Sequence, residues 1–94
     1  MSKTEYIVMR LLVSAGEEMN GLALIRQSQN RLKRGTIYVT LDRMQEKGFL
    51  DSRQEEVEAG RGGRPRRFYL PTGEGLKAMS EWESLLGDLA LGVS

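Results

Sequence analysis

The stretch Gly62-Gly63-Arg64-Pro65-Arg66-Arg67-Phe68-Tyr69 decides the fold of this chain. It is a glycine turn rich in arginine that leads directly into a strand with aromatic side chains. The glycines allow the tip to approach a nucleic-acid duplex, the arginines can meet phosphates, and the aromatic rings can anchor the strand to a core. The stretch therefore predicts the wing of a winged helix-turn-helix.

The segment Gly35-Thr36-Ile37-Tyr38-Val39-Thr40-Leu41 precedes the wing and predicts a helix that could enter a groove of DNA. We expect this reading helix over 34–47, because Ile37, Leu41 and Met44 have the i, i+4, i+7 spacing of one buried face. Gly48 suits the position after the last turn, where a left-handed backbone is common. Helix and wing together make a winged helix-turn-helix the leading interpretation.

Two helices precede the reading helix. Thr4 can cap the first and Gly16 suits its end, while Asn20 can cap the second, which should end near residues 27–30. Leu22 and Ile25 are the first candidates for the buried side of the second helix, and Leu24 is the third.

The wing hairpin is expected to have strands at 49–54 and 66–70, joined by a turn that holds three glutamates. Alternation places Phe68 on one face of the second strand and Arg67 with Tyr69 on the other.

A final helix follows, and Thr72 can cap it. Its apolar residues repeat with the 3-4-3-4 spacing of two helices packed side by side. They are Met79, Trp82, Leu86, Leu89 and Val93. We therefore expect an α+β, mostly helical fold: a winged helix-turn-helix with three helices, a two-stranded wing and a C-terminal dimerisation helix. The DNA-binding domain would span 1–72 and the dimerisation helix 73–94.

Composition narrows the function. The chain has 94 residues, enough for one domain, and lacks both cysteine and histidine, which removes thiolate chemistry and the commonest general base and metal ligand. The carboxylate pairs Glu17-Glu18 and Glu55-Glu56 lie in polar turns, where solvated charge is a better interpretation than acid-base catalysis. We expect no enzyme activity, no cofactor and no metal. No apolar run is long enough to span a bilayer, so we expect a cytoplasmic protein without membrane contact.

Charge is unevenly distributed along the chain. Residues 26–67 hold eleven Lys/Arg and six Asp/Glu, a net charge of +5, whereas the remainder carries −4. Segregated charge of this kind favours a polyanionic partner, and the alternative is chance clustering of solvated residues.

The candidate DNA contacts lie on the reading helix and the wing. Basic residues at the helix N-terminus can bind phosphate or guanine, Gly35 allows close approach, and Val39 can contact a thymine methyl group. The set is Lys33, Arg34, Gly35, Thr36, Tyr38, Val39, Thr40 and Arg43 on the helix, with Arg61, Arg64 and Arg66 on the wing. Simpler interpretations stay open: Val39 could be exposed without a partner, Tyr38 could be half-buried for packing alone, and the turn glutamates could hold the wing arginines.

These residues resemble the PadR family of bacterial transcriptional regulators. The helix motif Gly35-Thr36-Ile37-Tyr38, continued over 41–50, and the wing motif 63–69 are similar to the patterns of that family. The resemblance implies a homodimeric repressor on double-stranded DNA with a palindromic operator, whose C-terminal helix packs against the partner's N-terminal helix. It implies operator-backbone contacts by Thr36 and Tyr38. The implied dimerisation residues are Tyr6, Met9, Met79, Trp82, Leu86 and Leu89.

Three positions depart from the family pattern. The second helix opens with Gly21-Leu22-Ala23 in place of Gly-Tyr-Glu, Lys33 stands where a serine cap is common, and Val39 stands where proline often follows the tyrosine. These changes leave the fold intact and the operator sequence open. Two other functions stay open as well. One is a winged helix that binds a protein partner, and the other is a ligand-sensing regulator with a planar small-molecule effector at Trp82.

Overall fold

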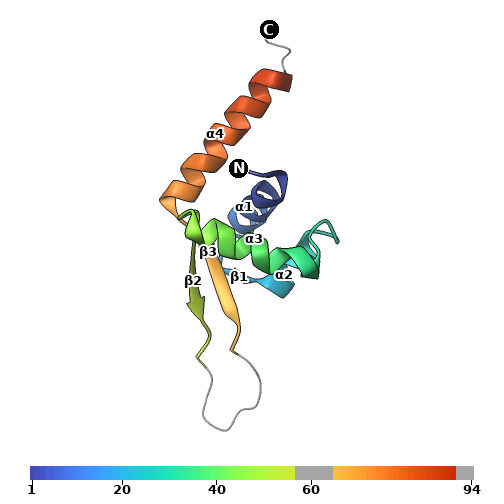
Figure 1. Cartoon of the computed structure of the whole chain (residues 1–94), viewed down its shortest axis with the longest axis vertical. Helices are drawn as coiled ribbons and strands as arrows, with labels where there is room; N and C mark the ends of the chain where they lie inside the picture. Colours follow the sequence, from blue (N-terminus) through green and yellow to red (C-terminus); the bar gives the residue numbers. More distant parts are fainter. Residues whose placement is uncertain (57–64, 91–94) are drawn as a thin grey trace.

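The computed structural model describes residues 1–56 and 65–90, with side chains described as far as residue 87. Its elements are, in chain order, α1 (Lys3–Ala15), β1 (Met19–Asn20), α2 (Gly21–Gln27), α3 (Arg34–Glu46), β2 (Leu50–Gln54), β3 (Arg67–Pro71) and α4 (Gly73–Ala90). The first three helices gather beside the sheet, and α4 leaves them as a long rod (Figure 1). The predicted α+β, mostly helical winged helix-turn-helix is confirmed.

Ser2, rather than Thr4, caps α1. The Ser2 hydroxyl accepts a hydrogen bond from the Glu5 amide at 3.1 Å, and the Glu5 carboxylate accepts one from the Ser2 amide at 2.8 Å. The expectation for Thr4 was wrong because this reciprocal pair starts the helix at Lys3 and leaves Thr4 inside the first turn. Gly16 ends the helix as expected, with a left-handed φ of 66°.

The second helix begins where predicted, but of its three expected inward residues it buries Leu24, the one placed last, most completely. The Asn20 side chain accepts a hydrogen bond from the Ala23 amide at 2.8 Å, which confirms the cap. Leu24 is completely buried, whereas Leu22 is exposed and Ile25 is only partly covered. The preference for Leu22 and Ile25 over Leu24 was wrong, because a 7-residue helix is too short for its spacing to identify the buried side. The buried side is set by the packing of α1 and α3 against this helix.

The hairpin belongs to a three-stranded antiparallel sheet in which β3 lies between β1 and β2. Tyr69 of β3 pairs with Met19 on one side and with Ser52 on the other. The strand β1 was not predicted, because two residues are too few for an alternating pattern. It connects the start of α2 to the wing and so fixes the hairpin against the helices (Figure 1).

The core confirms the predicted inner face of the reading helix. Ile37, Leu41 and Met44 of α3 are completely buried, and Tyr69 anchors the wing beside them with 3% of its surface exposed. Leu70, on the outer face of the wing, is exposed. The buried apolar residues are Val8, Met9, Leu12, Met19, Leu24, Leu32, Ile37, Leu41, Met44, Leu50, Tyr69 and Met79.

The start of α4 is tied to the end of α3. The Thr72 hydroxyl accepts a hydrogen bond from the Gly75 amide at 3.0 Å, which confirms the predicted cap, and donates one to the Gly48 carbonyl. Gly48 has a φ of 81°, the left-handed conformation expected after α3. A side chain at Gly75 would collide with the carbonyl of Phe49, so α4 begins in direct contact with the backbone that leaves α3.

Candidate nucleic-acid interface

The outward face of α3 carries the residues expected to contact DNA. Val39, at the middle of this face, is 50% exposed, and Tyr38 beside it is 46% exposed. The exposed members of the predicted set are Lys33, Arg34, Gly35, Thr36, Tyr38, Val39 and Arg43, while Thr40 is half-buried. The helical part of the predicted set is therefore open to solvent, apart from the half-buried Thr40.

The two threonines on this face use their hydroxyl protons inside the helix. The Thr36 hydroxyl donates to the Lys33 carbonyl at 3.2 Å, and the Thr40 hydroxyl donates to the Thr36 carbonyl at 2.9 Å. In these rotamers each side chain presents an oxygen acceptor and a methyl group. Donation of either hydroxyl proton to a phosphate requires rotation of the side chain.

The N-terminus of α3 is basic and has no side-chain cap. Lys33 occupies the cap position with extended backbone angles, and its side chain makes no capping hydrogen bond. Unpaired amides at a helix N-terminus together with the positive end of the helix dipole favour an anion. Lys33 and Arg34 add formal positive charge at the same end.

Tyr38 is held in place by a glycine of α2. A Cβ built on Gly21 would lie 2.8 Å from Tyr38 Cε1 and 3.1 Å from the Tyr38 hydroxyl oxygen, so the ring lies directly against the Gly21 backbone. The hydroxyl end of the side chain is therefore the part that packs on Gly21, while Tyr38 as a whole is 46% exposed.

A cleft of about 570 Å³ separates α3 from the wing. We call it the wing cleft, and its lining residues are Asn20, Gly21, Leu22, Tyr38, Asp42, Pro65, Arg66, Arg67 and Tyr69. Burial raises the pKa of Tyr69, and the neighbouring carboxylate of Asp42 raises it further. The tyrosine therefore stays a neutral phenol, and the charges of the cleft come from its two arginines and Asp42.

The wing arginines fall into two groups. Arg61 and Arg64, predicted as DNA contacts, lie outside the described residues. Arg66 is described, and its backbone is bonded to Glu55: the Glu55 amide donates to the Arg66 carbonyl at 2.7 Å, and the Arg66 amide donates to the Glu55 carboxylate at 3.3 Å. Over 1–56 and 65–87, neither Arg66 nor Arg67 forms an ion pair with a turn glutamate.

Two charged residues of the wing cleft were absent from the predicted contact set. Arg67 lines the cleft from the inner face of the hairpin, and Asp42 lines it from α3. The alternation that pairs Arg67 with Tyr69 was a usable signal, since Tyr69 faces the helices. For Asp42 the sequence holds no comparable signal, because its position depends on how α3 turns toward the wing.

The residues expected at a subunit contact divide into buried and exposed ones. Met9 and Met79 lie in the core of their own chain, where α1 packs against α4, and their part in a subunit contact stays a prediction. Trp82 is half-buried and Leu86 is exposed, and the side chain of Leu89 lies outside the described part. Leu85, which was not predicted, is 54% exposed.

Tyr6 ties the two helices together within the chain. Its hydroxyl donates to Glu83 Oε2 at 2.7 Å, and Arg10 Nη1 lies 3.7 Å from the same oxygen. The hydrogen bond to Glu83 raises the pKa of Tyr6, and burial and the charge of Glu83 add to the increase, while Arg10 opposes it. Tyr6 therefore fixes α4 on α1 of its own chain.

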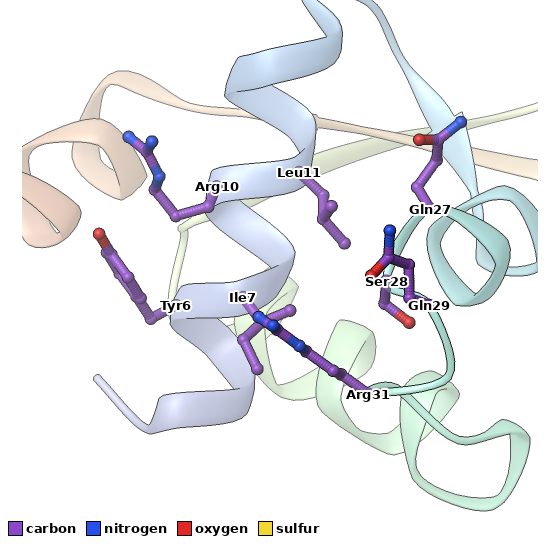
Figure 2. A pocket seen from close by; sticks show the side chains of 8 residues that line it. All are labelled: Tyr6, Ile7, Arg10, Leu11, Gln27, Ser28, Gln29 and Arg31. Atoms are coloured by element: carbon purple, nitrogen blue, oxygen red, sulfur yellow. The ribbon is translucent and has the colours of Figure 1, made fainter.

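A second pocket, of about 360 Å³, lies between α1 and the connection from α2 to α3 (Figure 2). Figure 2 shows Arg31 reaching from this connection toward Ile7 on α1. The residues that line this second pocket are Tyr6, Ile7, Arg10, Leu11, Gln27, Ser28, Gln29 and Arg31, and Trp82 is not among them.

The described residues contain no acidic cluster able to hold a metal ion. None of the described helices is long and apolar enough to cross a membrane.

Comparison with known proteins agrees with this architecture. The family model for the transcriptional regulator PadR-like family matches residues 8–81. A PadR family transcriptional regulator from Eggerthella lenta is 28% identical, with 96% of this chain and 80% of that chain covered and a TM-score of 0.75. A PadR-like transcription factor from Bacteroides fragilis is 27% identical, with 96% and 85% covered and a TM-score of 0.77.

A more distant structure shares the fold alone. F93 from STIV, a winged-helix DNA-binding protein, is 20% identical, with 95% of this chain and 92% of that chain covered and a TM-score of 0.72. The search of curated proteins gave no match.

Proposed function

Because this chain belongs to the PadR-like family of transcriptional regulators, we propose that it is a homodimeric repressor that binds a two-fold symmetric operator. The family is one of regulators rather than enzymes. In the proposal, helix 34–47 enters the major groove, and wing 55–68 lies on the DNA backbone or in the adjacent minor groove. The protein acts in the cytoplasm and needs no cofactor.

The observation that carries the proposal is the surface formed by α3 and the wing cleft. The outward side of α3 presents an exposed Val39 between polar and basic residues, and Arg66 and Arg67 line the cleft next to it. An α-helix fits the major groove, where an apolar side chain can contact a thymine methyl group and arginine can bind guanine or phosphate. Basic side chains beside the helix then supply the phosphate contacts that position it.

The proposed dimer rests on α4. This helix extends from the body of the molecule (Figure 1) and exposes Leu76, Leu85 and Leu86. Exposed leucines on a projecting helix favour burial against a second copy, because the removal of apolar surface from water stabilises association. A two-fold axis through α4 would present two copies of α3 to half-sites about one helical turn apart.

Selection from a pool of random DNA duplexes at near-physiological salt tests the proposal. We expect enrichment of a two-fold symmetric sequence, and binding that weakens steeply as salt rises. Enrichment of a single, unsymmetrical half-site would contradict the dimer while supporting the reading helix. Absence of any salt-dependent duplex binding would contradict the proposal and favour the alternative in which the hairpin binds a protein partner.

A planar effector at Trp82 is an alternative that the half-buried position of this residue on α4 leaves open. Titration of Trp82 fluorescence with a panel of planar cations tests it, since Trp82 is the single tryptophan of the chain. Quenching that saturates would support an effector site, and unchanged emission across the panel would argue against it.

A further inference from the structure

We propose that Arg67 binds a DNA phosphate at the wing cleft and that Ser52 and Gln45 are positioning residues that hold its guanidinium ready for that contact. The inference rests on the proposed function, because it assigns Arg67 a role in DNA binding. Arg67 belongs to the wing motif but is not in the predicted set of DNA contacts, and no role in binding was predicted for Ser52 or Gln45.

The three residues form a hydrogen-bonded chain across three elements. Arg67 Nη1 on β3 donates to Ser52 Oγ on β2 at 3.0 Å, and Ser52 Oγ donates to Gln45 Oε1 on α3 at 3.1 Å. The hydroxyl of Ser52 uses its proton toward the helix and a lone pair toward the arginine. Loss of this one hydroxyl therefore breaks both bonds and disconnects the wing arginine from the reading helix.

Strand register places this chain on the face of the hairpin that meets α3. Ser52 pairs with Tyr69 and Gln54 pairs with Arg67, and paired residues of antiparallel strands share a face. Tyr69 of that face is buried in the core, and Arg67 lines the wing cleft together with Tyr38 of α3. The guanidinium is thus held at the junction of the reading helix and the wing, where the helical and hairpin surfaces proposed to face DNA meet.

Arg53, a second arginine of the hairpin, has partners that differ from those of Arg67. Arg53, on the outer face, forms an ion pair with Glu18, donating from Nε to Glu18 Oε2 at 2.8 Å, and lies over the ring of Phe68 at 5.0 Å. Its charge is compensated within the protein. Arg67, by contrast, has a neutral hydroxyl as its hydrogen-bond partner, and no ion pair of Arg67 occurs in the described part of the chain.

The arrangement suits a phosphate better than a base. A guanidinium has five donors, and the contact with Ser52 occupies one, so a face of the fork remains for phosphate oxygens. An arginine held in position before binding loses less conformational freedom when the contact forms, and this raises affinity. Phosphate contacts carry no sequence information, so Arg67 should affect all duplexes alike.

A double-mutant cycle on the full chain tests the inference. Binding of R67A, S52A and the double variant to the enriched operator duplex is measured by fluorescence anisotropy between about 50 and 200 mM salt. We expect R67A to weaken binding and to reduce the slope of log K against log salt by about 0.9, the value for one phosphate contact. We expect S52A to weaken binding about fivefold in the wild-type background and to have no further effect in the R67A background.

Two matched variants distinguish positioning from a general loss of structure. S52T keeps a hydroxyl and should retain wild-type binding, and R53A removes an arginine of the same hairpin from the outer face and should leave the salt slope unchanged. An unchanged salt slope in R67A would overturn the inference. So would a double variant whose loss of affinity equals the product of the two single losses, or an S52T variant that binds as weakly as S52A. A wild-type chain that binds no duplex would overturn the proposed function together with it.

Discussion

The carboxylate of Glu5, at the start of α1, accepts a hydrogen bond from the ammonium of Lys47, directly after α3, with 2.8 Å between Lys47 Nζ and Glu5 Oε2. The Glu5 side chain is 4% exposed, whereas that of Lys47 is half-exposed. The same carboxylate completes the capping box with Ser2. One side chain therefore both starts the first helix and fixes the end of the reading helix against it.

We predict that E5Q destabilises the fold by about 1–2 kcal/mol at neutral pH, because a charged hydrogen bond to a buried carboxylate is lost. The free energy of unfolding is measured by urea titration followed by circular dichroism. The control is E83Q, whose carboxylate is more exposed and should change stability by no more than about 0.5 kcal/mol. Equal effects of the two variants would contradict a special role for Glu5.

The same pair predicts a loss of stability in acid. Burial alone would raise the pKa of Glu5, but hydrogen bonds from Lys47 and from the Ser2 amide and the charge of Lys47 outweigh it and lower the pKa below 4.5. A group with a lowered pKa in the folded state contributes stability above its unfolded pKa and loses that contribution as pH falls through its folded pKa. Stability should therefore decline below about pH 4.5, and the decline should be smaller in E5Q. Melting curves of both proteins from neutral to acid pH would show this, and parallel curves would contradict it.

A pair of glycines at the start of α4 predicts opposite outcomes for the same substitution. G75A should destabilise the protein by about 1–3 kcal/mol, because its methyl group would collide with the backbone carbonyl of Phe49. G73A meets no atom within 4 Å and should be neutral or slightly stabilising, since alanine favours helix. Thermal unfolding of both variants is the measurement, and equal melting temperatures would show that the junction of α3 and α4 is looser than described.

The position of Asp42 in the wing cleft predicts that removal of its charge strengthens DNA binding. Its carboxylate lines the wing cleft with Arg66 and Arg67, where it would oppose an approaching phosphate. We expect D42N to raise affinity for duplex DNA about threefold at low salt, with the gain shrinking as salt screens the charge. Anisotropy titrations at two salt concentrations measure it, with E46Q, on the same helix but outside the lining of the wing cleft, as the control. Weaker binding by D42N would place Asp42 among the base-contacting residues.

The projecting helix predicts a variant that separates the subunits. Replacing both exposed leucines by glutamate, L85E with L86E, should produce a monomer, because charge would replace the apolar surface proposed to join two copies. Sedimentation velocity measures the mass, and K77E, an exposed charge change on the same helix, is the control. A dimer that survives the double substitution would contradict this interface, and a monomeric wild type would contradict the dimer itself.

The reading helix was predictable because its signals are local. Ile37, Leu41 and Met44 repeat with the helical period, so their spacing identifies the buried face without knowledge of what covers it. The residues at the helix ends were nearly as predictable from the sequence, and Asn20, Gly16 and Thr72 were assigned correctly. For α1 the choice between Ser2 and Thr4 depended on which residue could exchange hydrogen bonds with Glu5.

Other features depend on neighbours that come from distant parts of the chain. The strand β1 is two residues long and exists because β3 lies beside it. The spacing of Met9 and Met79 fits a helix face in a subunit contact as well as one in a core. The packing of α1 with α4 places both residues in the core of their own chain. Periodicity shows that a face is apolar, but it does not show whether the same chain or a partner covers it.

By itself, the sequence determined the order of the four helices and the two hairpin strands, the inner face of α3, most helix ends and the family, because these follow from residue spacing and short motifs. Tertiary structure alone decided which charged and polar side chains meet. Glu5 and Lys47 are 42 residues apart in the chain, and Arg67 reaches Gln45 through Ser52. Such contacts depend on the relative placement of whole elements, which the packing of their apolar faces fixes.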